Sequence, residues 1–364
     1  MKVIGVETDL LRVPLPRQVS MPAAQDARPA THVDVVIVRL LTDGPHTGLG
    51  FTYSFGGGVA LRSIIDTVIA PIIVGHDPLA TEWLFLKAWA ELEGVGFAGL
   101  AARAYAAVDF ALWDVKGKVA NMPVARVLGG YRARLKAIVS DTATPALGAK
   151  QAVKETKLAL TAGAAGVQVE VGTVDPELDE ERLKQLREGV PDGAWFEISA
   201  GGRYDFSTAA WMGQIGEQDF GIDSFCDPLR LDDLDNLGRL IDRLEVGISV
   251  GASADRPADH LRIIDRGGIS AIRIDPLRLG GITPARKITL VAELKQIAIY
   301  PVRLPEIGVH LCGSAVYGRM CEYVDWFAEL FAGGPRFENG QLVVPTGPGL
   351  GISVCDDVAA KWRV

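Results

Sequence analysis

The feature that most constrains the fold is an alternation of short apolar runs and amphipathic segments that begins near residue 134. The runs have the length of strands, the segments have helical spacing, and one such pair recurs about every 25–30 residues. A repeated strand-then-helix order predicts a parallel sheet, and seven or eight repeats predict a closed barrel. An open, doubly wound sheet is the alternative, but no GxGxxG motif opens a helix after a strand. The predicted strands span residues 135–141, 165–171, 194–199, 221–227, 246–252, 269–275 and 297–302, and the predicted helices span 148–162, 177–189, 206–216, 232–243, 256–266, 283–295 and 309–321.

The first third of the chain has a mixed α and β character. A Pro- and Ala-rich segment at 21–30 and the FGGG segment at 55–58 are predicted to be loops, and loops often carry function. The turn-rich tail is predicted to be β structure that rejoins this N-terminal region. Strand patterns cover residues 3–13, 33–42 and 47–54, and helical patterns cover 58–73, 80–93 and 99–119.

Composition limits the classes of partner. Hydrophobic residues make up 48% and charged residues 23%, which is typical of globular proteins. The formal net charge of −8 disfavours a nucleic-acid backbone or an anionic membrane surface as the main partner. The N-terminal sequence lacks the apolar core of a signal peptide, and no run reaches the roughly 18 apolar residues of a membrane helix. We therefore expect a soluble, cytoplasmic protein.

Cysteine and histidine usage argues against zinc sites and disulfides. The four cysteines form no CxxC pair, which excludes a zinc ribbon and favours a reducing compartment. The chain has only five histidines, and no two of them have metal-ligand spacing. They are His32, His46, His76, His260 and His310.

Polar side chains follow several predicted strands at the end where a barrel carries its chemistry. Because side chains alternate along a strand, three strand ends each place two polar residues on one face. If those faces point inward, several carboxylates converge on one mouth, where like charges repel unless they are paired, protonated or bound to a cation. The candidates for that cation are a metal ion and a positively charged substrate. The pairs are Gln168 with Glu170, Glu197 with Ser199, and Arg273 with Asp275, and the nearest cationic partners by strand position are Arg203, Arg230, Arg273 and Arg303.

Three stretches of the sequence point to a family. They are AVDFALWDVKGKVANMPVARVLGG at 107–130, DPLRLGGIT at 275–283 and PRFENGQLVVPTGPGLGI at 335–352. Together they resemble the mandelate racemase and muconate-lactonizing branch of the enolase superfamily, in order along essentially the whole chain. The resemblance implies a modified (β/α)7β barrel of the TIM type with an α+β capping domain, loops near residues 20 and 55 that close on substrate, and a homo-oligomer. It implies a capping domain at 1–125, a barrel at 126–335 and a C-terminal segment at 336–364 that returns to the capping domain.

The chemistry of this family removes a proton next to a carboxylate, with Lys or His as base and a magnesium ion stabilising the enediolate. This sequence departs from the pattern. The usual Lys-x-Lys of the second strand is replaced by Gln168 and Glu170, and Val302 lies nearest the position of the seventh-strand His. Asp275 matches the sixth-strand Asp, and Glu322 matches a late Glu that can act as general acid.

The three magnesium positions that the resemblance implies are also altered. Glu197 stands for the third-strand Asp, and Cys226, followed by Asp227, replaces the fourth-strand Glu. The fifth-strand acid falls at Gly251 or Ala252, whose side chains hold no ligand atom. Because Mg²⁺ prefers hard oxygen ligands, we expect no magnesium site of the usual kind. A re-formed metal site that uses Glu197, Asp227 and one other acid is the alternative.

We therefore expect a diverged racemase-like protein that acts on a small carboxylate. If it is active, it moves a proton at carbon as a racemase, epimerase or dehydratase, with Asp275 and Glu170 as opposed acid and base and Glu322 as acid. The alternative is a non-catalytic relative that binds a ligand or serves as an oligomer partner. The residues expected to bind substrate are Arg203, Arg230, Arg273, Arg303 and Ser199.

Overall fold

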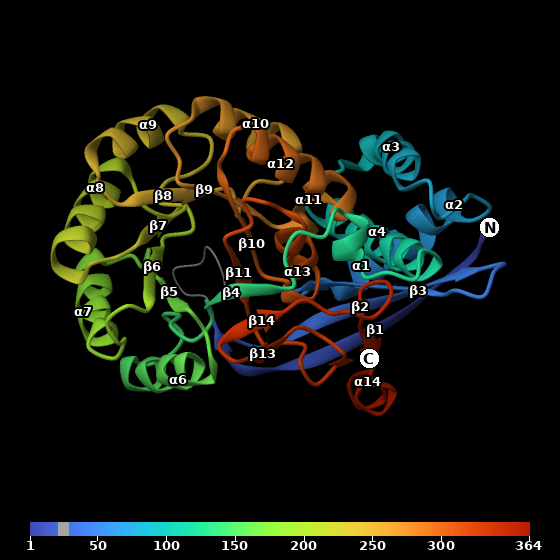
Figure 1. The fold of residues 1–364 in the computed structure, drawn as a ribbon, viewed down its shortest axis with the longest axis horizontal. Helices are drawn as coiled ribbons and strands as arrows, with labels where there is room; N and C mark the ends of the chain where they lie inside the picture. Colours follow the sequence, from blue (N-terminus) through green and yellow to red (C-terminus); the bar gives the residue numbers. More distant parts are fainter. Residues whose placement is uncertain (21–28) are drawn as a thin grey trace.

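The computed structural model describes residues 1–20 and 29–364, in which an N-terminal α+β region lies against a barrel (Figure 1). The N-terminal region is built on an antiparallel sheet in the order β1-β2-β3. The helix α4 packs on β3, where glycines allow close approach: a Cβ at Gly50 would lie 1.9 Å from the carbonyl oxygen of Ala107. The elements are β1 (Val3–Val19), β2 (Ala30–Thr42), β3 (Gly48–Ser54), α1 (Gly58–Ile64), a π-helical turn (Ile65–Ile69), α2 (Ala70–Ile73), α3 (Thr81–Leu92) and α4 (Leu100–Val119). The strands and helices predicted for this region are confirmed.

Eight parallel strands form the barrel in the described part of the chain. Each of the first six pairs with the next in sequence order, and β11 returns to pair with β4. A parallel bridge between Ile299 and Gly318 joins β10 to the segment before β11 and closes the ring. The strands are β4 (Arg134–Val139), β5 (Gly166–Glu170), β6 (Trp195–Ser199), β7 (Ser224–Cys226), β8 (Gly247–Val250), β9 (Ala271–Ile274), β10 (Ala298–Pro301) and β11 (Met320–Tyr323).

Helices surround the strands on the outside, as Figure 1 shows, so the fold is a modified (β/α)7β barrel of the TIM type with a capping domain. The open-sheet alternative is excluded. One predicted helix has the wrong boundaries. The helix placed at 309–321 begins at Pro305 and ends at Ser314, and the rest of the predicted range is a turn that leads into β11. At Gly318 a Cβ would lie 2.2 Å from the carbonyl oxygen of Cys312, so the chain folds back tightly onto the helix there. The helices between the strands are α6 (Ala149–Ala162), α7 (Pro176–Arg187), α8 (Phe206–Ile215), α9 (Leu234–Arg243), α10 (Pro257–Arg266), α11 (Pro276–Leu279), α12 (Ile282–Leu294) and α13 (Pro305–Ser314).

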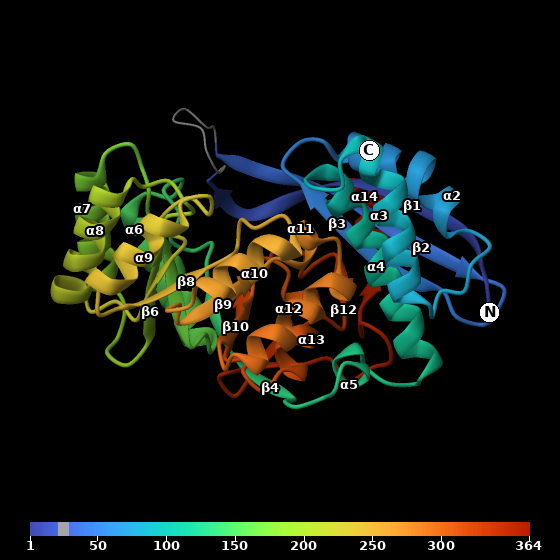
Figure 2. The same ribbon diagram turned by 90° about the horizontal axis from the view of Figure 1, so that it is seen from above.

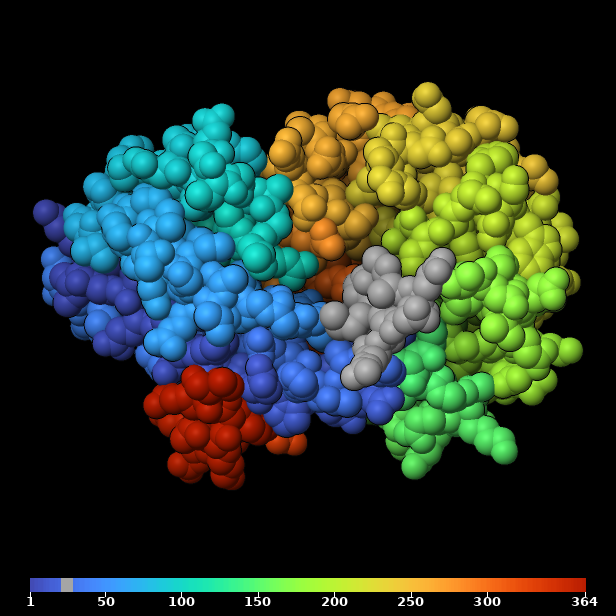
Figure 3. Space-filling view, turned by 180° about the vertical axis from the view of Figure 1, so that it is seen from behind, coloured from blue at the N-terminus to red at the C-terminus, as the bar shows by residue number. Residues whose placement is uncertain are grey.

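The tail contacts both regions. The hairpin of β13 (Arg336–Glu338) and β14 (Gln341–Val343) extends the barrel sheet, because β14 pairs with β4. A second pairing encloses this hairpin in sequence: β12 (Phe331–Ala332), before it, pairs with β15 (Ser353–Val354), after it. The last helix, α14 (Asp356–Trp362), lies against the N-terminal region, where Figure 3 shows it in red beside the blue strands. The division of the chain at residues 125 and 335 stays a prediction.

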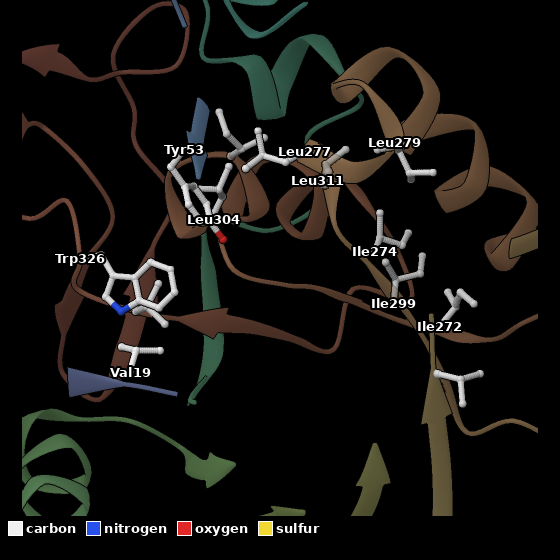
Figure 4. Packing of buried hydrophobic residues seen from close by; sticks show 14 of the residues in the cluster. Val19, Tyr53, Ile272, Ile274, Leu277, Leu279, Ile299, Leu304, Leu311 and Trp326 are labelled. Atoms are coloured by element: carbon white, nitrogen blue, oxygen red, sulfur yellow. The ribbon is translucent and has the colours of Figure 1, made fainter. Parts of the chain in front are cut away.

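The N-terminal region covers the ends of the barrel strands. Figure 4 shows Val19 and Tyr53 next to the barrel residues Trp326 and Leu304 in one buried hydrophobic cluster. The rings of Tyr53 and Trp326 meet edge to face, with centroids 5.6 Å apart. Figure 2 shows the hairpin of β1 and β2 over one end of the barrel. No helix in the described residues is long and apolar enough to cross a membrane.

A buried histidine joins the linker after α4 to the returning tail. His310 Nδ1 accepts the backbone N–H of Ala125 in the short helix α5 (Val124–Val127), and Nε2 donates to the carbonyl oxygen of Leu350, both at 3.1 Å. Burial lowers the pKa of His310 to about 4 from its usual 6.5. A protonated ring could not accept the Ala125 N–H, so only the neutral form suits this place.

We expect the folded chain to lose stability through His310 as the pH falls. Because the folded pKa lies below the unfolded one, this contribution is present above pH 6.5 and is lost as the pH falls toward 4. Between pH 7 and pH 5 the loss should be about 2 kcal/mol. Urea unfolding of the wild type and His310→Gln at both pH values measures it. An unfolding free-energy gap between the two proteins that stays constant with pH would contradict this role.

Candidate active site

A layer of polar side chains crosses the barrel interior, where branched apolar residues usually pack. Arg273 on β9 lies at its centre, with a side chain only 4% exposed. One guanidinium nitrogen is 3.1 Å from Glu197 Oε1, and the other is 3.3 Å from Glu322 Oε2. Burial acts to lower the pKa of Arg273, but the neighbouring acidic groups, Cys226, Glu197 and Glu322, outweigh it and raise that pKa. The layer therefore holds a permanent cation inside the barrel.

Glu197 is fully enclosed and fully hydrogen-bonded. Its Oε1 accepts from Gln168 Nε2 at 2.6 Å as well as from Arg273, and its Oε2 accepts from Trp195 Nε1 at 3.1 Å. The strand register places Glu197 beside Gln168, whereas Ser199 lies beside Glu170. Glu197 thus lies one pleat below the mouth, and Ser199 is the β6 residue at mouth level.

The last residue of β7, Cys226, and the residue after it, Asp227, are also buried in the interior. Cys226 Sγ is 3.2 Å from the Arg273 guanidinium and accepts from Ser249 Oγ at 3.1 Å. Burial raises the pKa of Cys226 well above its usual value despite the arginine, so the thiol is neutral at neutral pH. Asp227 has a φ of 40° and accepts the Gly251 N–H at 2.8 Å through Oδ1. Burial also raises the pKa of Asp227, and Arg273 opposes that rise.

Glu170 lies at the mouth and forms an ion pair. Its Oε1 is 3.0 Å from Arg203 Nη2, and its side chain is 21% exposed. Arg203 also donates to the carbonyl oxygen of Val171, which fixes the guanidinium across the end of β5. This carboxylate is the most accessible of the predicted acid and base groups.

Asp275 is completely buried, and its two oxygens have different surroundings. Oδ1 accepts the backbone N–H of Leu277 at 3.0 Å and so caps α11. Oδ2 has no hydrogen-bond partner among the described residues and lies 3.9 Å from Arg303 Nε and 3.8 Å from Arg278 Nε. Asp275 is therefore a buried carboxyl group that faces two arginines.

Arg303 lies two residues after the end of β10 and has a left-handed φ of 69°. In the described structure its guanidinium makes no hydrogen bond within the chain, and its side chain is 35% exposed. Burial acts to lower the pKa of Arg303, but Tyr53, Glu322 and Asp275 outweigh it and raise that pKa. Tyr53 reaches this place from β3, and burial raises its own pKa. Arg303 is thus a charged arginine at the barrel mouth whose N–H donors are free to bind a ligand.

The remaining predicted residues divide into two groups. Glu322 accepts from Ser140 Oγ at 2.6 Å in addition to Arg273, so it belongs to the polar layer. Arg230 instead turns to Asp232 at 2.8 Å, with a side chain 75% exposed. Ion pairing within the chain therefore involves Arg203, Arg273 and Arg303 with four of the converging acids, and Arg230 lies apart from them.

Sequence reasoning missed three contributors to the site. Trp195 could have been found from alternation, since it shares its strand face with Glu197. Ser140 could have been found as a polar residue at the end of a barrel strand, because it directly follows β4. Tyr53 carries no local signal, because it reaches the mouth from β3 of the N-terminal sheet.

No metal cluster is assembled in the described residues. Across residues 1–20 and 29–364, no group of three or more His, Cys, Asp or Glu side chains is placed to hold a metal ion. The two candidates for a re-formed site are engaged elsewhere: Glu197 accepts three hydrogen bonds, and Asp227 accepts from the backbone of β8's terminus.

Two family models together match most of the chain. Residues 6–129 match the N-terminal domain of mandelate racemase and muconate lactonizing enzyme, and residues 151–358 match the model described as enolase C-terminal domain-like. The chain belongs to the mandelate racemase and muconate lactonizing branch of the enolase superfamily.

Relatives within this branch have several activities. The chain is 27% identical to arabinonate dehydratase of Saccharolobus solfataricus, with 91% of each chain covered. It is 25% identical to an L-Ala-D/L-Glu epimerase of Clostridium acetobutylicum, covering 94% of this chain and 96% of the relative. The L-talarate/galactarate dehydratase of Salmonella typhimurium, solved with Mg and L-lyxarohydroxamate, superposes with a TM-score of 0.93 at 26% identity, covering 100% of this chain and 93% of that one. The enolase-superfamily relatives thus include dehydratases and epimerases that act on carboxylates.

The resemblance assigns two loops to closure over substrate, and only one of them lies within the described residues. The loop near residue 20 falls within residues 21–28, which lie outside the described residues. The loop near residue 55 lies at the mouth, where Phe55 packs edge to face on Trp326 with centroids 5.6 Å apart. This enolase-superfamily chain therefore presents a tyrosine and a phenylalanine from its capping domain beside the barrel mouth.

Proposed function

We propose that this chain acts on a small carboxylate at the barrel mouth and moves a proton at the carbon next to it. The reaction class is that of a racemase, epimerase or dehydratase, and it proceeds without the usual magnesium site of the family. The observation that carries the proposal is Arg303, a partly exposed guanidinium at the mouth that makes no hydrogen bond within the described chain. Family membership supports the class of chemistry, and the side chains of the site support the departure from metal.

The residues at the three metal positions do not fit Mg²⁺. Cys226 offers a soft sulfur atom, Gly251 and Ala252 have no side-chain ligand atom, and the acid Glu197 already accepts three hydrogen bonds. Arg273 lies 3.1 Å from Glu197 and 3.2 Å from Cys226, so a guanidinium already occupies the space between them. A divalent cation beside it would be repelled. No step of the proposed reaction uses a metal.

Arg303 is proposed to bind the substrate carboxylate. A guanidinium donates two parallel hydrogen bonds to a carboxylate, which fixes the orientation of the substrate. Asp275 is fully buried, so we give it a positioning role: its Oδ2 holds the Arg303 side chain toward the mouth. This positioning role replaces the acid or base role expected for Asp275 from the sequence, because the burial of Asp275 disfavours direct contact with substrate.

Glu170 is the proposed base. Its carboxylate takes the proton from the carbon next to the substrate carboxylate, and the electron pair of the broken C–H bond enters an enediolate beside Arg303. In a dehydration the same proton passes from Glu170 to the β-hydroxyl group, which leaves as water. In an epimerisation Glu322, in its protonated form, gives its proton to the opposite face and becomes a carboxylate, while Glu170 keeps the proton that it removed and exchanges it with water. Arg203 keeps Glu170 in place across the end of β5.

Exchange of substrate hydrogen with solvent tests this function. Sugar acids, hydroxy acids and amino-acid derivatives are incubated with the protein in D2O, with added magnesium or with EDTA. We expect deuterium at the carbon next to the carboxylate in both conditions, its loss in Glu170→Gln, and its retention in the exposed control Glu188→Gln. Exchange only with magnesium would overturn the metal-free part of the proposal. No exchange with any compound would overturn catalysis.

The second candidate function is a non-catalytic binding protein. It is favoured by the ion pair between Glu170 and Arg203 at 3.0 Å, because one oxygen of the proposed base is already engaged within the chain. A thermal-shift screen with the same compounds separates the two functions. A ligand that raises the melting temperature without any hydrogen exchange supports the binding protein.

Replacing Arg303 with glutamine should weaken carboxylate binding by at least about tenfold, because a charge-assisted bidentate contact is lost. Stability should also fall, by about 1–3 kcal/mol, because the completely buried Asp275 keeps only Arg278 as a charged neighbour. Isothermal titration with a compound found in the thermal-shift screen measures the affinity. Arg230→Gln provides the contrast, with less than about a twofold effect, because Arg230 faces Asp232 at the surface. Equal losses in both variants would contradict the assignment of Arg303.

A further inference from the structure

A cavity of about 650 Å³ lies at the end of the barrel opposite the mouth. Its lining includes the first residues of several strands: Lys136 near the start of β4, Trp195 on β6, Ser224 on β7 and Ala298 on β10. Figure 2 shows this end, with β4, on the side away from the hairpin of β1 and β2. Sites for small ligands in proteins have volumes of about 300–1,000 Å³, so the cavity is large enough to hold one. In barrels of this type the chemistry lies at the other end.

The lining is strongly cationic, although the whole chain carries a net charge of −8. Arg132, Arg134, Lys136 and Arg319 contribute four positive charges, and Asp223 is the one carboxylate in the lining. Asp223 Oδ2 accepts the backbone N–H of Phe196 at 2.8 Å, so part of its hydrogen-bonding capacity is used within the chain. The balance of charge favours an anion.

Two of these cations have no partner in the described residues. Arg134 forms an ion pair with Glu338 at 3.1 Å, and Arg132 donates to backbone carbonyl oxygens. Lys136 and Arg319 are exposed, and no carboxylate of the described chain lies within 4.0 Å of either. They are therefore available to a ligand.

Aromatic side chains supply the rest of the surface. Trp195, Tyr300 and Tyr317 all line the cavity. Trp195 is held in place by its hydrogen bond to Glu197, and Tyr300 is only 8% exposed. Arg319 lines the same cavity as Tyr300, whose pKa burial raises to about 12. A cation and an aromatic face thus lie together, a combination suited to a flat ring that carries an anionic group.

We propose that this cavity binds a small organic dianion with a flat apolar ring, of which an aryl phosphate is the simplest form. The anionic group lies against Lys136 and Arg319, and the ring lies against Trp195 and Tyr300. Ser224 and Ser270 provide hydroxyl groups in the same lining. This site is separate from the mouth and does not depend on the function proposed there.

Isothermal titration with phenyl phosphate tests the site on the full chain. A dissociation constant of about 0.1–1 mM is expected for a ligand of this size. Inorganic phosphate and phenol each carry one half of the ligand, and each should bind at least about tenfold more weakly. Equal binding of inorganic phosphate would overturn the aromatic part of the proposal, and no binding of phenyl phosphate would overturn the whole.

Variants locate the binding. The double variant Lys136→Gln with Arg319→Gln should weaken phenyl phosphate binding by at least about tenfold, and both positions are exposed, so folding should be unaffected. The matched control, Lys154→Gln with Lys157→Gln, removes the same charge from the exposed face of α6 and should leave the affinity unchanged. Quenching of tryptophan fluorescence on binding should be reduced in Trp195→Phe. If Arg303→Gln removes phenyl phosphate binding while the double variant retains it, the ligand binds at the mouth and the inference is wrong.

Discussion

Replacing Arg273 with methionine is expected to lower the free energy of unfolding by about 3–5 kcal/mol. The substitution keeps most of the side-chain length but removes the cation that lies between Glu197 and Glu322. Glu197 is completely buried, and an uncompensated charge at such a place is strongly destabilising. Urea unfolding followed by circular dichroism at pH 7 measures the effect.

A second variant separates loss of charge from loss of packing. Adding Glu197→Gln to Arg273→Met removes the stranded anion while leaving a group that can still bond Gln168 and Trp195. We expect the double variant to recover part of the lost stability, so the two substitutions should be strongly non-additive. A loss of less than about 1 kcal/mol in the single variant would mean that water solvates the layer.

Replacing Gly50 with alanine is expected to destabilise the chain by about 3 kcal/mol or more. A Cβ at this position would lie 1.9 Å from the carbonyl oxygen of Ala107 and 2.8 Å from the backbone nitrogen of Ala111. Both atoms belong to the backbone of α4, whose middle is buried throughout, so no side chain can rotate away. The helix must move off β3, and thermal unfolding should show a lower melting temperature.

Gly5 provides the matched control for this substitution. It lies on β1 of the same sheet, and a Cβ there would approach only the Leu41 side chain, at 3.5 Å. Neither Gly5 nor Gly50 has a positive φ, so the gain from restricting the unfolded chain is the same for both. Gly5→Ala should change stability by less than about 1 kcal/mol. Equal effects at the two positions would contradict the close approach of helix and sheet.

The barrel could be predicted because its signal is repeated. Seven strand-and-helix pairs each carry apolar spacing, so an error at one pair does not change the fold. The eighth strand, Met320–Tyr323, was missed because the helix predicted at 309–321 was extended past its true end at Ser314 and into the start of the strand. Its pairing with β4, almost two hundred positions earlier, decides its structure.

The sequence could predict which residues belong to the candidate site, but not how deep in the barrel each of them lies. Alternation along β6 correctly places Glu197 and Ser199 on one face, yet the strand register decides which of them reaches the mouth. The ion-pair partners of the arginines were less predictable still. Arg203 pairs with Glu170, which is distant from it in sequence, whereas Arg230 pairs with Asp232, two positions away. Such choices depend on side-chain packing, which a single sequence does not reveal.

The return of the tail to the N-terminal sheet has a consequence for synthesis on the ribosome. Arg363 bridges to Leu11 and forms an ion pair with Asp9, and the Val364 N–H donates to the Leu10 carbonyl oxygen at 3.0 Å. The edge of β1 is therefore paired with residues that are translated only after all the barrel strands. Pairing over such a separation in sequence is slow, and an unpaired strand edge invites aggregation. The nascent N-terminal region must wait for the whole barrel to emerge, so chaperone dependence should concentrate on this exposed edge.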